Sequence, residues 1–154
     1  MPRALALAVL LAAAAGPAGA YCVANELRDR AVTVAQEPHS DPLRQDRRFV
    51  RTLQPGERRC CNPRNLDCNP GGRHNSVVNL LIELPGTPAY QCGYPEGDDP
   101  NVKVTGAGTV RIVARGRIPT GAPPYAVRVR THDRQDLTGP RGLPCPEVPK
   151  KGKP

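Results

Sequence analysis

Aromatic side chains are scarce in this chain of 154 residues, which contains one Phe, four Tyr and no Trp. Exposed aromatic rings are the usual stacking platforms for sugars and for single-stranded nucleic acids. Their scarcity therefore argues against an aromatic sugar-binding platform and against a specific nucleic-acid partner. It also leaves a core of Val, Ile and Leu, in which disulfides are expected to contribute much of the stability.

The chain is also poor in residues for nucleophilic catalysis. Beyond residue 20 the only serines are Ser40 and Ser76, and neither lies in the glycine pattern that surrounds a hydrolase nucleophile. The three histidines are expected to be solvated loop residues, and they are His39 near Asp41, His74, and His132 beside Asp133. We therefore expect no catalytic residue and no enzyme activity.

A segment long enough to span a bilayer is absent from the sequence. The one long apolar run, at 5–15, falls short of the roughly 20 residues that a membrane helix needs. With a basic residue before it and small residues up to Ala20 after it, this run has the layout of a secretory signal peptide over residues 1–20. A large residue, Tyr21, precedes the first cysteine, which excludes a lipid anchor. We expect cleavage after Ala20 and an extracellular mature chain.

Six cysteines follow the signal, and an even number in an oxidising compartment predicts three disulfides. They are Cys22, Cys60, Cys61, Cys68, Cys92 and Cys145. The adjacent Cys60 and Cys61 cannot bridge each other without a strained ring, and on a strand they point to opposite faces. A local bridge between Cys61 and Cys68 would close a short loop, and the full pairing stays open.

Metal binding is the alternative use of these side chains. A zinc site from Cys60, Cys61, Cys68 and His74 lacks the closely paired cysteines that zinc-binding turns present. A free catalytic thiol would not persist outside the cell. The acidic patch at 96–99 lacks the spaced ligands of a calcium loop. We therefore expect no metal and no cofactor.

Alternating apolar and polar residues dominate the rest of the chain and predict short β-strands. Nineteen prolines disfavour long helices. The predicted strands are 21–27, 31–36, 48–53, 57–61, 76–84, 89–93, 101–105, 109–115 and 125–131. Short strands at this spacing predict an all-β fold, an antiparallel β-sandwich with little or no helix outside the signal peptide.

Three segments carry more specific predictions. The stretch at 77–84 is more continuously apolar than the other strands, which predicts burial on both of its faces. In the last strand, Tyr125, Val127 and Val129 are expected to face the core. The glycines at 106–108 indicate a hairpin between the flanking strands rather than a phosphate-binding loop.

Positive charge is the strongest surface feature, because 22 Lys and Arg outnumber 14 Asp and Glu, and most of the basic residues are arginine. Arginine donates forked hydrogen bonds to carboxylates, phosphates and sulfates. One group flanks a predicted hairpin and consists of Arg47, Arg48, Arg51, Arg58 and Arg59. A second group lies on the outward faces of two other strands and consists of Arg111, Arg115, Arg128 and Arg130.

If these hairpins adjoin, the cross-strand arginines form a positive plate. Like charges opposite one another destabilise a sheet, so such a plate indicates an anionic partner. The alternative is a solvated basic surface that interspersed carboxylates neutralise. The carboxylates nearest in sequence are Glu26, Asp46, Glu57, Glu83 and Asp133.

The N-terminal half carries a recognisable pattern of cysteines and turns. It reads Tyr21-Cys22-Val23-x-Asn25-x-Leu27 and then Phe49-x-x-x-Leu53-x-Pro55-Gly56-Glu57-x-x-Cys60-Cys61, with Cys68 after it. Over residues 21–84 this pattern resembles small secreted cysteine-rich proteins of fungi, whose function is uncharacterised. The resemblance implies a compact β-sandwich and an extracellular location, and it implies no active residues.

These patterns predict a signal peptide at 1–20, a single disulfide-rich β-sandwich domain at 21–145 and a flexible basic tail at 146–154. The function that fits best is a non-enzymatic extracellular interaction protein, effector-like or antimicrobial, that binds anionic wall polysaccharide or acidic lipid through its arginines. Two alternatives stay open. One is a small wall-active hydrolase whose carboxylates the fold brings together, and the other is a structural cell-wall protein.

Overall fold

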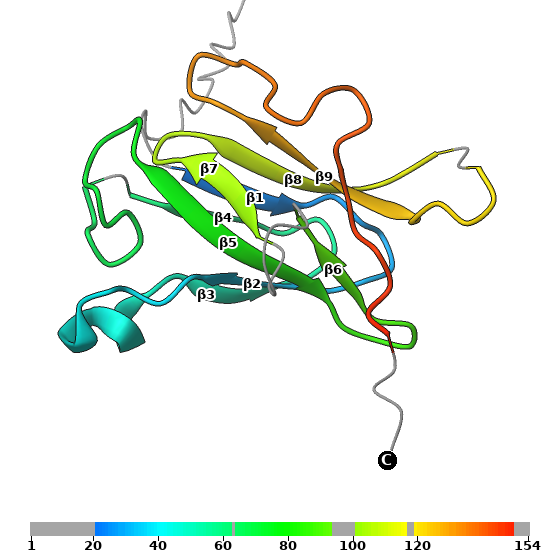
Figure 1. Cartoon of the computed structure of the whole chain (residues 1–154), viewed down its shortest axis with the longest axis horizontal. Helices are drawn as coiled ribbons and strands as arrows, with labels where there is room; N and C mark the ends of the chain where they lie inside the picture. Colours follow the sequence, from blue (N-terminus) through cyan, green and yellow to red (C-terminus); the bar gives the residue numbers. More distant parts are fainter. Residues whose placement is uncertain (1–20, 63, 94–100, 117–118, 150–154) are drawn as a thin grey trace, which may run out of the picture.

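Two β-sheets packed face to face make up the protein in the computed structural model (Figure 1). The structure describes residues 21–62, 64–93, 101–116 and 119–149. The predicted signal peptide, the acidic patch at 96–99 and residues 150–154 of the predicted tail lie outside these ranges. No helix within the described ranges is long and apolar enough to cross a membrane. The all-β sandwich predicted from the sequence is confirmed.

The first sheet has its strands in the order β10-β9-β8-β1-β4. Their bounds are Leu143–Pro144 (β10), Tyr125–Arg130 (β9), Thr109–Ala114 (β8), Tyr21–Asn25 (β1) and Arg58–Cys61 (β4). The central strands β1 and β8 run parallel, whereas the other neighbours are antiparallel. Because parallel neighbours need a crossover connection, the chain visits the second sheet between β1 and β8.

The second sheet has the order β3-β2-β5-β6, and all of its pairings are antiparallel. The bounds are Val50–Leu53 (β3), Val32–Gln36 (β2), Val77–Leu84 (β5) and Tyr90–Cys92 (β6). A further strand, β7 (Val102–Thr105), pairs with the first half of β5, whereas β6 pairs with its second half.

Each of the nine predicted strands forms within its predicted range. Two elements were not predicted, the short strand β10 and the 3-10 helix η1 (Pro42–Arg47). The side chain of Asp41 caps η1 by accepting a hydrogen bond from the Leu43 backbone N–H (3.0 Å), and a proline opens its first turn. These local signals are typical of helix starts, but they are too short to show a hydrophobic period.

Inward-facing Val, Leu and Ile side chains of both sheets form the core. Val127 and Val129 face this core as predicted, and Tyr125 packs against its border. The prediction for β5 is wrong, because only alternate residues from Val78 onward are buried, and Val77 is 65% exposed. The outer face of β5 meets solvent, as in antiparallel sheets that cover a core on one side.

Two turns that predict hairpins are instead corners between the sheets. Residues 54–57 carry the chain from β3 in the second sheet to β4 in the first, and the Glu57 N–H donates to the Gln54 carbonyl oxygen (2.9 Å). Residues 106–108 connect β7 in the second sheet to β8 in the first. Both hairpin predictions are therefore wrong, because a tight turn does not determine which sheet each flanking strand joins.

The predicted three disulfides form, and they pair all six cysteines. Cys22–Cys60 joins directly opposed positions of β1 and β4 on the outer face, with the Cα atoms 4.0 Å apart. The neighbouring Cys61 is buried on the core side and closes the short loop to Cys68. Because these cysteines are bonded to one another, the zinc alternative is excluded.

The third disulfide lies at one lateral edge of the sandwich, which the C-terminal segment closes. Cys92 of β6 and Cys145 lie opposite each other with their Cα atoms 3.9 Å apart. The segment pairs with β9 through β10 and then with β6, where the Gln91 N–H donates to the Pro146 carbonyl oxygen (3.1 Å). Figure 1 shows this red segment crossing from one sheet to the other. The pairing reaches Val148, past the predicted end of the domain.

Candidate functional site

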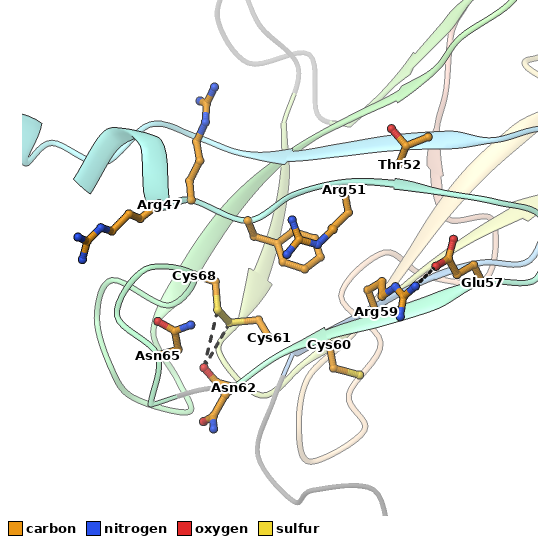
Figure 2. Close-up of a pocket in the computed structure, with 12 residues that line it drawn as sticks. Arg47, Arg51, Thr52, Glu57, Arg59, Cys60, Cys61, Asn62, Asn65 and Cys68 are labelled. Atoms are coloured by element: carbon orange, nitrogen blue, oxygen red, sulfur yellow. Dashed lines mark hydrogen bonds and ion pairs between the residues drawn. A yellow bond between two sulfur atoms is a disulfide. The ribbon is translucent and has the colours of Figure 1, made fainter. Parts of the chain in front are cut away.

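The opposite lateral edge of the sandwich is open and holds a groove of about 470 Å³ between β3 and β4 (Figure 2). Four of the predicted arginines line it, and they are Arg47, Arg48, Arg51 and Arg59. The lining also includes Phe49, Glu57, Asn62, Asn65 and the Cys61–Cys68 disulfide. The fold thus brings most of the first arginine group together, although β3 and β4 belong to different sheets.

Strand alternation places Arg51 and Arg59 inside this groove. On β3, Arg51 has the same parity as the buried Phe49 and Leu53, so it takes the inward side. On β4, Arg59 lies two residues before the buried Cys61 and is inward for the same reason. Both strands are sheet edges among the described strands, so their inward side chains reach solvent in the gap between the sheets.

One aromatic ring, that of Phe49, supports Arg51 from the core side. Its guanidinium carbon lies 5.8 Å from the centroid of the Phe49 ring, within cation–π range. Its Nη1 donates to the Val50 carbonyl oxygen (2.7 Å). Phe49 packs edge-to-face on Tyr21, with 5.6 Å between the ring centroids. Since a guanidinium has five N–H donors, Arg51 is held in place with most of its donors left for a ligand.

Glu57 is the acidic residue among the described residues that line the groove. One carboxylate oxygen lies 2.5 Å from Nη2 of Arg59, and the other accepts a hydrogen bond from the Gln54 backbone N–H (2.9 Å). The Gln54 hydrogen bond, followed by the charge of Arg59, lowers the pKa of Glu57. The corner between β3 and β4 therefore fixes a carboxylate that orients Arg59 and offsets part of the positive charge.

Arg47 and Arg48 form the rim of the groove at the η1 end. Arg47 ends η1, and its side chain points away from Arg51 and Arg59 in Figure 2. Arg48 is half-buried, and its Nη1 donates to the Gln36 carbonyl oxygen of β2 (3.4 Å). Arg51 and Arg59 thus define the inner groove, and the two rim arginines extend its positive charge outward.

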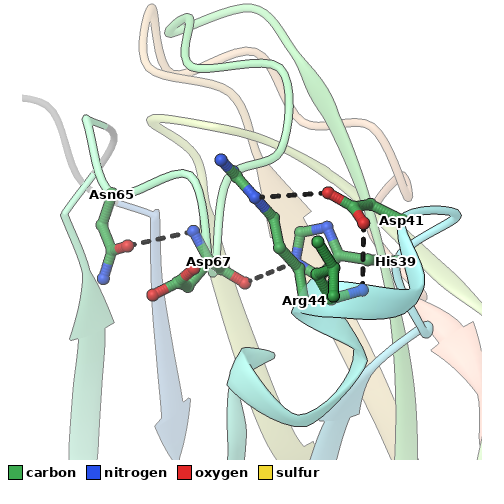
Figure 3. Close-up of polar contacts among 6 residues, drawn as sticks. His39, Asp41, Arg44, Asn65 and Asp67 are labelled. Carbon is green, nitrogen blue, oxygen red and sulfur yellow. Dashed lines mark hydrogen bonds and ion pairs between the residues drawn. The ribbon is translucent and has the colours of Figure 1, made fainter.

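The loop closed by Cys61–Cys68 forms the remaining wall. His39 holds this loop from outside, because its Nε2 hydrogen-bonds to the Asp67 carbonyl oxygen at 2.8 Å (Figure 3). Within the loop, Asn65 Oδ1 accepts a hydrogen bond from the Asp67 N–H (3.0 Å). His39 is only 8% exposed, so the prediction of a solvated residue is wrong. It links the segment before η1 to the wall of the groove.

The other two histidines are exposed, as predicted. The acidic neighbours of the histidines have local structural contacts of their own. Asp41 caps η1 and lies 3.7 Å from Nε of Arg44, and Asp133 accepts a hydrogen bond from the Thr131 hydroxyl. His39 contacts the Asp67 carbonyl oxygen rather than Asp41. The Thr131 hydroxyl, and after it the charge of His132, lower the pKa of Asp133.

The outer face of the first sheet carries a transverse row of arginines. Arg111 of β8 and Arg128 of β9 are directly opposed, and Arg58 of β4 lies in the same row through the intervening strand β1. The Glu26 carboxylate accepts two hydrogen bonds from Arg111 (2.5 and 2.7 Å) and raises the pKa of Arg111. The positive charge of this row is therefore partly neutralised, which agrees with the alternative of a solvated basic surface with interspersed carboxylates.

The remaining predicted arginines lie apart from this row. Arg130 forms an isolated β-bridge with Asp136. Arg115 lines a separate cavity of about 520 Å³, which Arg128 also lines. The predicted arginines thus lie in the groove, on the outer face of the first sheet and at the second cavity, and Arg128 belongs to both of the last two.

The uncharged lining of the groove was not predicted from the sequence. It consists of Phe49, Asn62 and Asn65, with His39 as a link to the wall. One usable signal was present, since the parity of Arg51 with Phe49 and Leu53 marks an inward-facing arginine. No local pattern indicates that a strand in the other sheet presents a second inward arginine to the same space.

Comparisons of the chain with protein-family models, with curated proteins and with solved structures found no match. The molecule is therefore classed by its own features, as a disulfide-stapled β-sandwich with one closed lateral edge and one open, arginine-lined edge. Guanidinium groups presented from both sheets can donate paired, charge-assisted hydrogen bonds to a carboxylate, sulfate or phosphate. The groove thus presents hydrogen-bond donors of the kind that an anion accepts from.

Proposed function

We propose that the protein is a secreted, non-enzymatic interaction protein that binds anionic surfaces, such as wall polysaccharide or acidic lipid, through the arginine groove. The observation that carries this proposal is the convergence of Arg51 and Arg59, from edge strands of opposite sheets, with Arg47 and Arg48 at the rim. Arginine forks match the geometry of carboxylates, sulfates and phosphates.

Edge protection is the competing explanation for these arginines, since inward-pointing charges keep edge strands from pairing with other chains. That role needs charge on β3 and β4. It does not need a guanidinium stacked on Phe49, nor a disulfide-closed wall that His39 holds. The supported geometry of the groove therefore favours ligand binding.

Three disulfides support the predicted extracellular location, because such bonds persist in oxidising compartments. The groove carboxylate of Glu57 is engaged by Arg59 and by the Gln54 backbone. The hydrolase and the structural wall protein stay predictions from the sequence, because no contact in the groove favours either of them.

The test is retention on immobilised heparin and on vesicles that contain phosphatidylserine, each over a salt gradient. We expect binding at low salt that weakens steeply as salt screens the charges. Arg51→Gln/Arg59→Gln should elute at much lower salt. The matched control Arg28→Gln/Arg134→Gln removes the same charge from exposed positions outside the groove and should elute near the wild type.

Two results would overturn the proposal. One is the absence of retention on both supports at low salt. The other is an equal loss of retention in the groove variant and in the control variant, which would indicate net charge rather than a site. Retention on heparin alone would assign the surface as a polysaccharide, and retention on vesicles alone would assign it as a lipid.

A further inference from the structure

The second cavity, of about 520 Å³, differs from the groove in the chemistry of its walls. It lies where β8 ends, beside β9 and the turn at 139–142. Its apolar lining residues are Val113, Ala114, Pro119, Ala122 and Pro140. Its charged lining residues are three arginines, Arg115, Arg128 and Arg141. The volume falls within the range of pockets that bind small molecules, roughly 300–1,000 Å³.

Two of these arginines are fixed by single hydrogen bonds to proline carbonyl oxygens. Arg115 Nη1 donates to Pro123 (3.3 Å), and Arg128 Nη2 donates to Pro140 (3.2 Å). Each guanidinium therefore keeps four of its five N–H groups. Such anchoring reduces the side-chain entropy that a ligand would otherwise have to immobilise.

The third arginine is presented by a tight turn. Gly139 and Gly142 both have a φ of 67°, and the Gly142 N–H donates to the Gly139 carbonyl oxygen (3.1 Å). Glycine adopts this left-handed conformation without the steric cost that other residues have. The turn holds Pro140 and Arg141 at the cavity, so one wall supplies both an apolar surface and a charge.

The three arginines have no carboxylate partner among the ion pairs of the described residues. On the same face of the sheet, the Glu26 carboxylate accepts two hydrogen bonds from Arg111. Among the described residues, the cavity thus combines arginines that have no carboxylate partner with a lining of prolines and small aliphatic residues.

We propose that this cavity binds a small organic anion with an apolar body, whose carboxylate, sulfate or phosphate head contacts the arginines while its hydrocarbon or aryl part packs against the prolines. An inorganic anion would leave the apolar wall uncovered, and a neutral amphiphile would leave the guanidinium groups unpaired. This inference goes beyond the groove and does not depend on the proposed function.

Isothermal titration with three probes tests whether the anionic head and the apolar body of the ligand both contribute to binding. Octyl sulfate, kept below its critical micelle concentration, carries both parts; sodium sulfate carries the head alone, and octyl glucoside carries the apolar part on a neutral head. We expect octyl sulfate to bind at least about tenfold more tightly than either of the others, because burial of its methylenes adds to the charge-assisted hydrogen bonds. Equal affinity for octyl sulfate and sodium sulfate would overturn the proposal.

Variants assign the binding to the cavity. Arg128→Gln and Arg141→Gln should each weaken octyl sulfate binding about tenfold, whereas the exposed control Arg28→Gln should bind like the wild type. In the groove variant Arg51→Gln/Arg59→Gln, whose own anion site is weakened, octyl sulfate should still bind more tightly than sodium sulfate. Loss of binding in the groove variant but not in Arg128→Gln would overturn the assignment. A negative heparin experiment would leave this result unaffected, so the two proposals fail separately.

Discussion

The two lateral edges of the sandwich both place an arginine against aromatic rings, but in different surroundings. At the closed edge the guanidinium carbon of Arg30 lies 5.3 Å from the ring centroids of both Tyr90 and Tyr125. Its Nη1 donates to the Pro88 carbonyl oxygen (2.8 Å). The C-terminal segment, which crosses between the sheets in Figure 1, pairs with the backbone of both tyrosines. The two tyrosine rings also contact each other edge-to-face, 5.1 Å apart.

At the open edge the equivalent arrangement is incomplete. Arg51 lies over a single ring, that of Phe49, and its side-chain hydrogen bond goes to the adjacent Val50. No strand among the described residues crosses between the sheets there beyond the corner at 54–57. The arginine at the closed edge thus contacts two rings and a distant carbonyl oxygen, whereas the arginine at the open edge contacts one ring and its neighbouring residue, as the proposed function requires.

The largest expected effect separates the two edges by their disulfides. Cys92→Ala/Cys145→Ala opens a loop with a separation of 53 residues and should destabilise the protein by about 4 kcal/mol. Cys61→Ala/Cys68→Ala opens one with a separation of 7 and should cost about 2.5 kcal/mol. Urea unfolding of both variants measures these values.

We expect heparin elution to rank the same two variants in the opposite order, with the larger loss of binding in the variant that loses less stability. Loss of Cys61–Cys68 releases a wall of the groove and should lower the elution salt, although this variant is the more stable of the two. Loss of Cys92–Cys145 should leave elution unchanged under conditions in which the variant is folded. Parallel losses of stability and of binding in both variants would remove the distinction between the edges.

The next effect compares the two arginines directly. Arg30→Met removes contacts with two rings and a hydrogen bond to a carbonyl oxygen, and it should cost about 2 kcal/mol of unfolding free energy. Arg51→Met should change stability by no more than about 0.5 kcal/mol, because it is an exposed edge residue, yet it should weaken heparin binding. Denaturation and heparin elution of both variants give a two-by-two comparison. If Arg51→Met were as destabilising as Arg30→Met, Arg51 would be a structural residue.

The strands of this fold can be predicted from the sequence, but the edges cannot. Alternation identifies each strand because one face of it must meet the core. The corner at 54–57 carries the same Pro-Gly signal as a hairpin. No residue near it indicates that β3 and β4 join different sheets. The closed edge depends on Cys145, whose partner Cys92 is separated from it by 53 residues.

The candidate site is predictable to a similar extent. Arg47, Arg48, Arg51 and Arg59 stand out by composition alone, whereas Arg58 stands out equally and lies on the outer face of the sheet. Parity separates Arg58 from Arg59 once Cys61 is known to be inward. Arg141 lies in a loop, where side chains do not alternate between two faces as they do on a strand. The sequence therefore did not indicate that Arg141 lines the second cavity.

A smaller effect concerns the tyrosine under the open edge. The Tyr21 hydroxyl is buried and has no hydrogen-bond partner among the described residues, so Tyr21→Phe should stabilise the protein by about 1 kcal/mol. Burial also raises the pKa of Tyr21. The folded protein therefore keeps the phenol protonated where the unfolded chain ionises, and this part of the stability is full below about pH 10 and is lost as the pH rises further.

Urea midpoints between pH 8 and pH 11 measure this alkaline loss of stability. Tyr21→Phe should lose less stability above pH 10 than the wild type. Tyr125→Phe at the closed edge is the control, and it should keep the alkaline loss of the wild type because Tyr21 is still present. Identical alkaline profiles for Tyr21→Phe and the wild type would contradict the assignment of the loss to the open edge.

The smallest expected effect tests whether Glu57 competes with a ligand for Arg59. Glu57→Gln keeps the shape of the corner but removes the charge that lies 2.5 Å from Arg59, so heparin binding should tighten by about twofold to threefold. The control Glu83→Gln makes the same charge change on the outer face of β5. Because the Gln54 hydrogen bond and Arg59 lower the pKa of Glu57, the carboxylate stays charged until the pH falls below its ordinary range. Below that point the wild type should approach the affinity of Glu57→Gln, and tighter binding in Glu83→Gln as well would show that net charge alone is responsible.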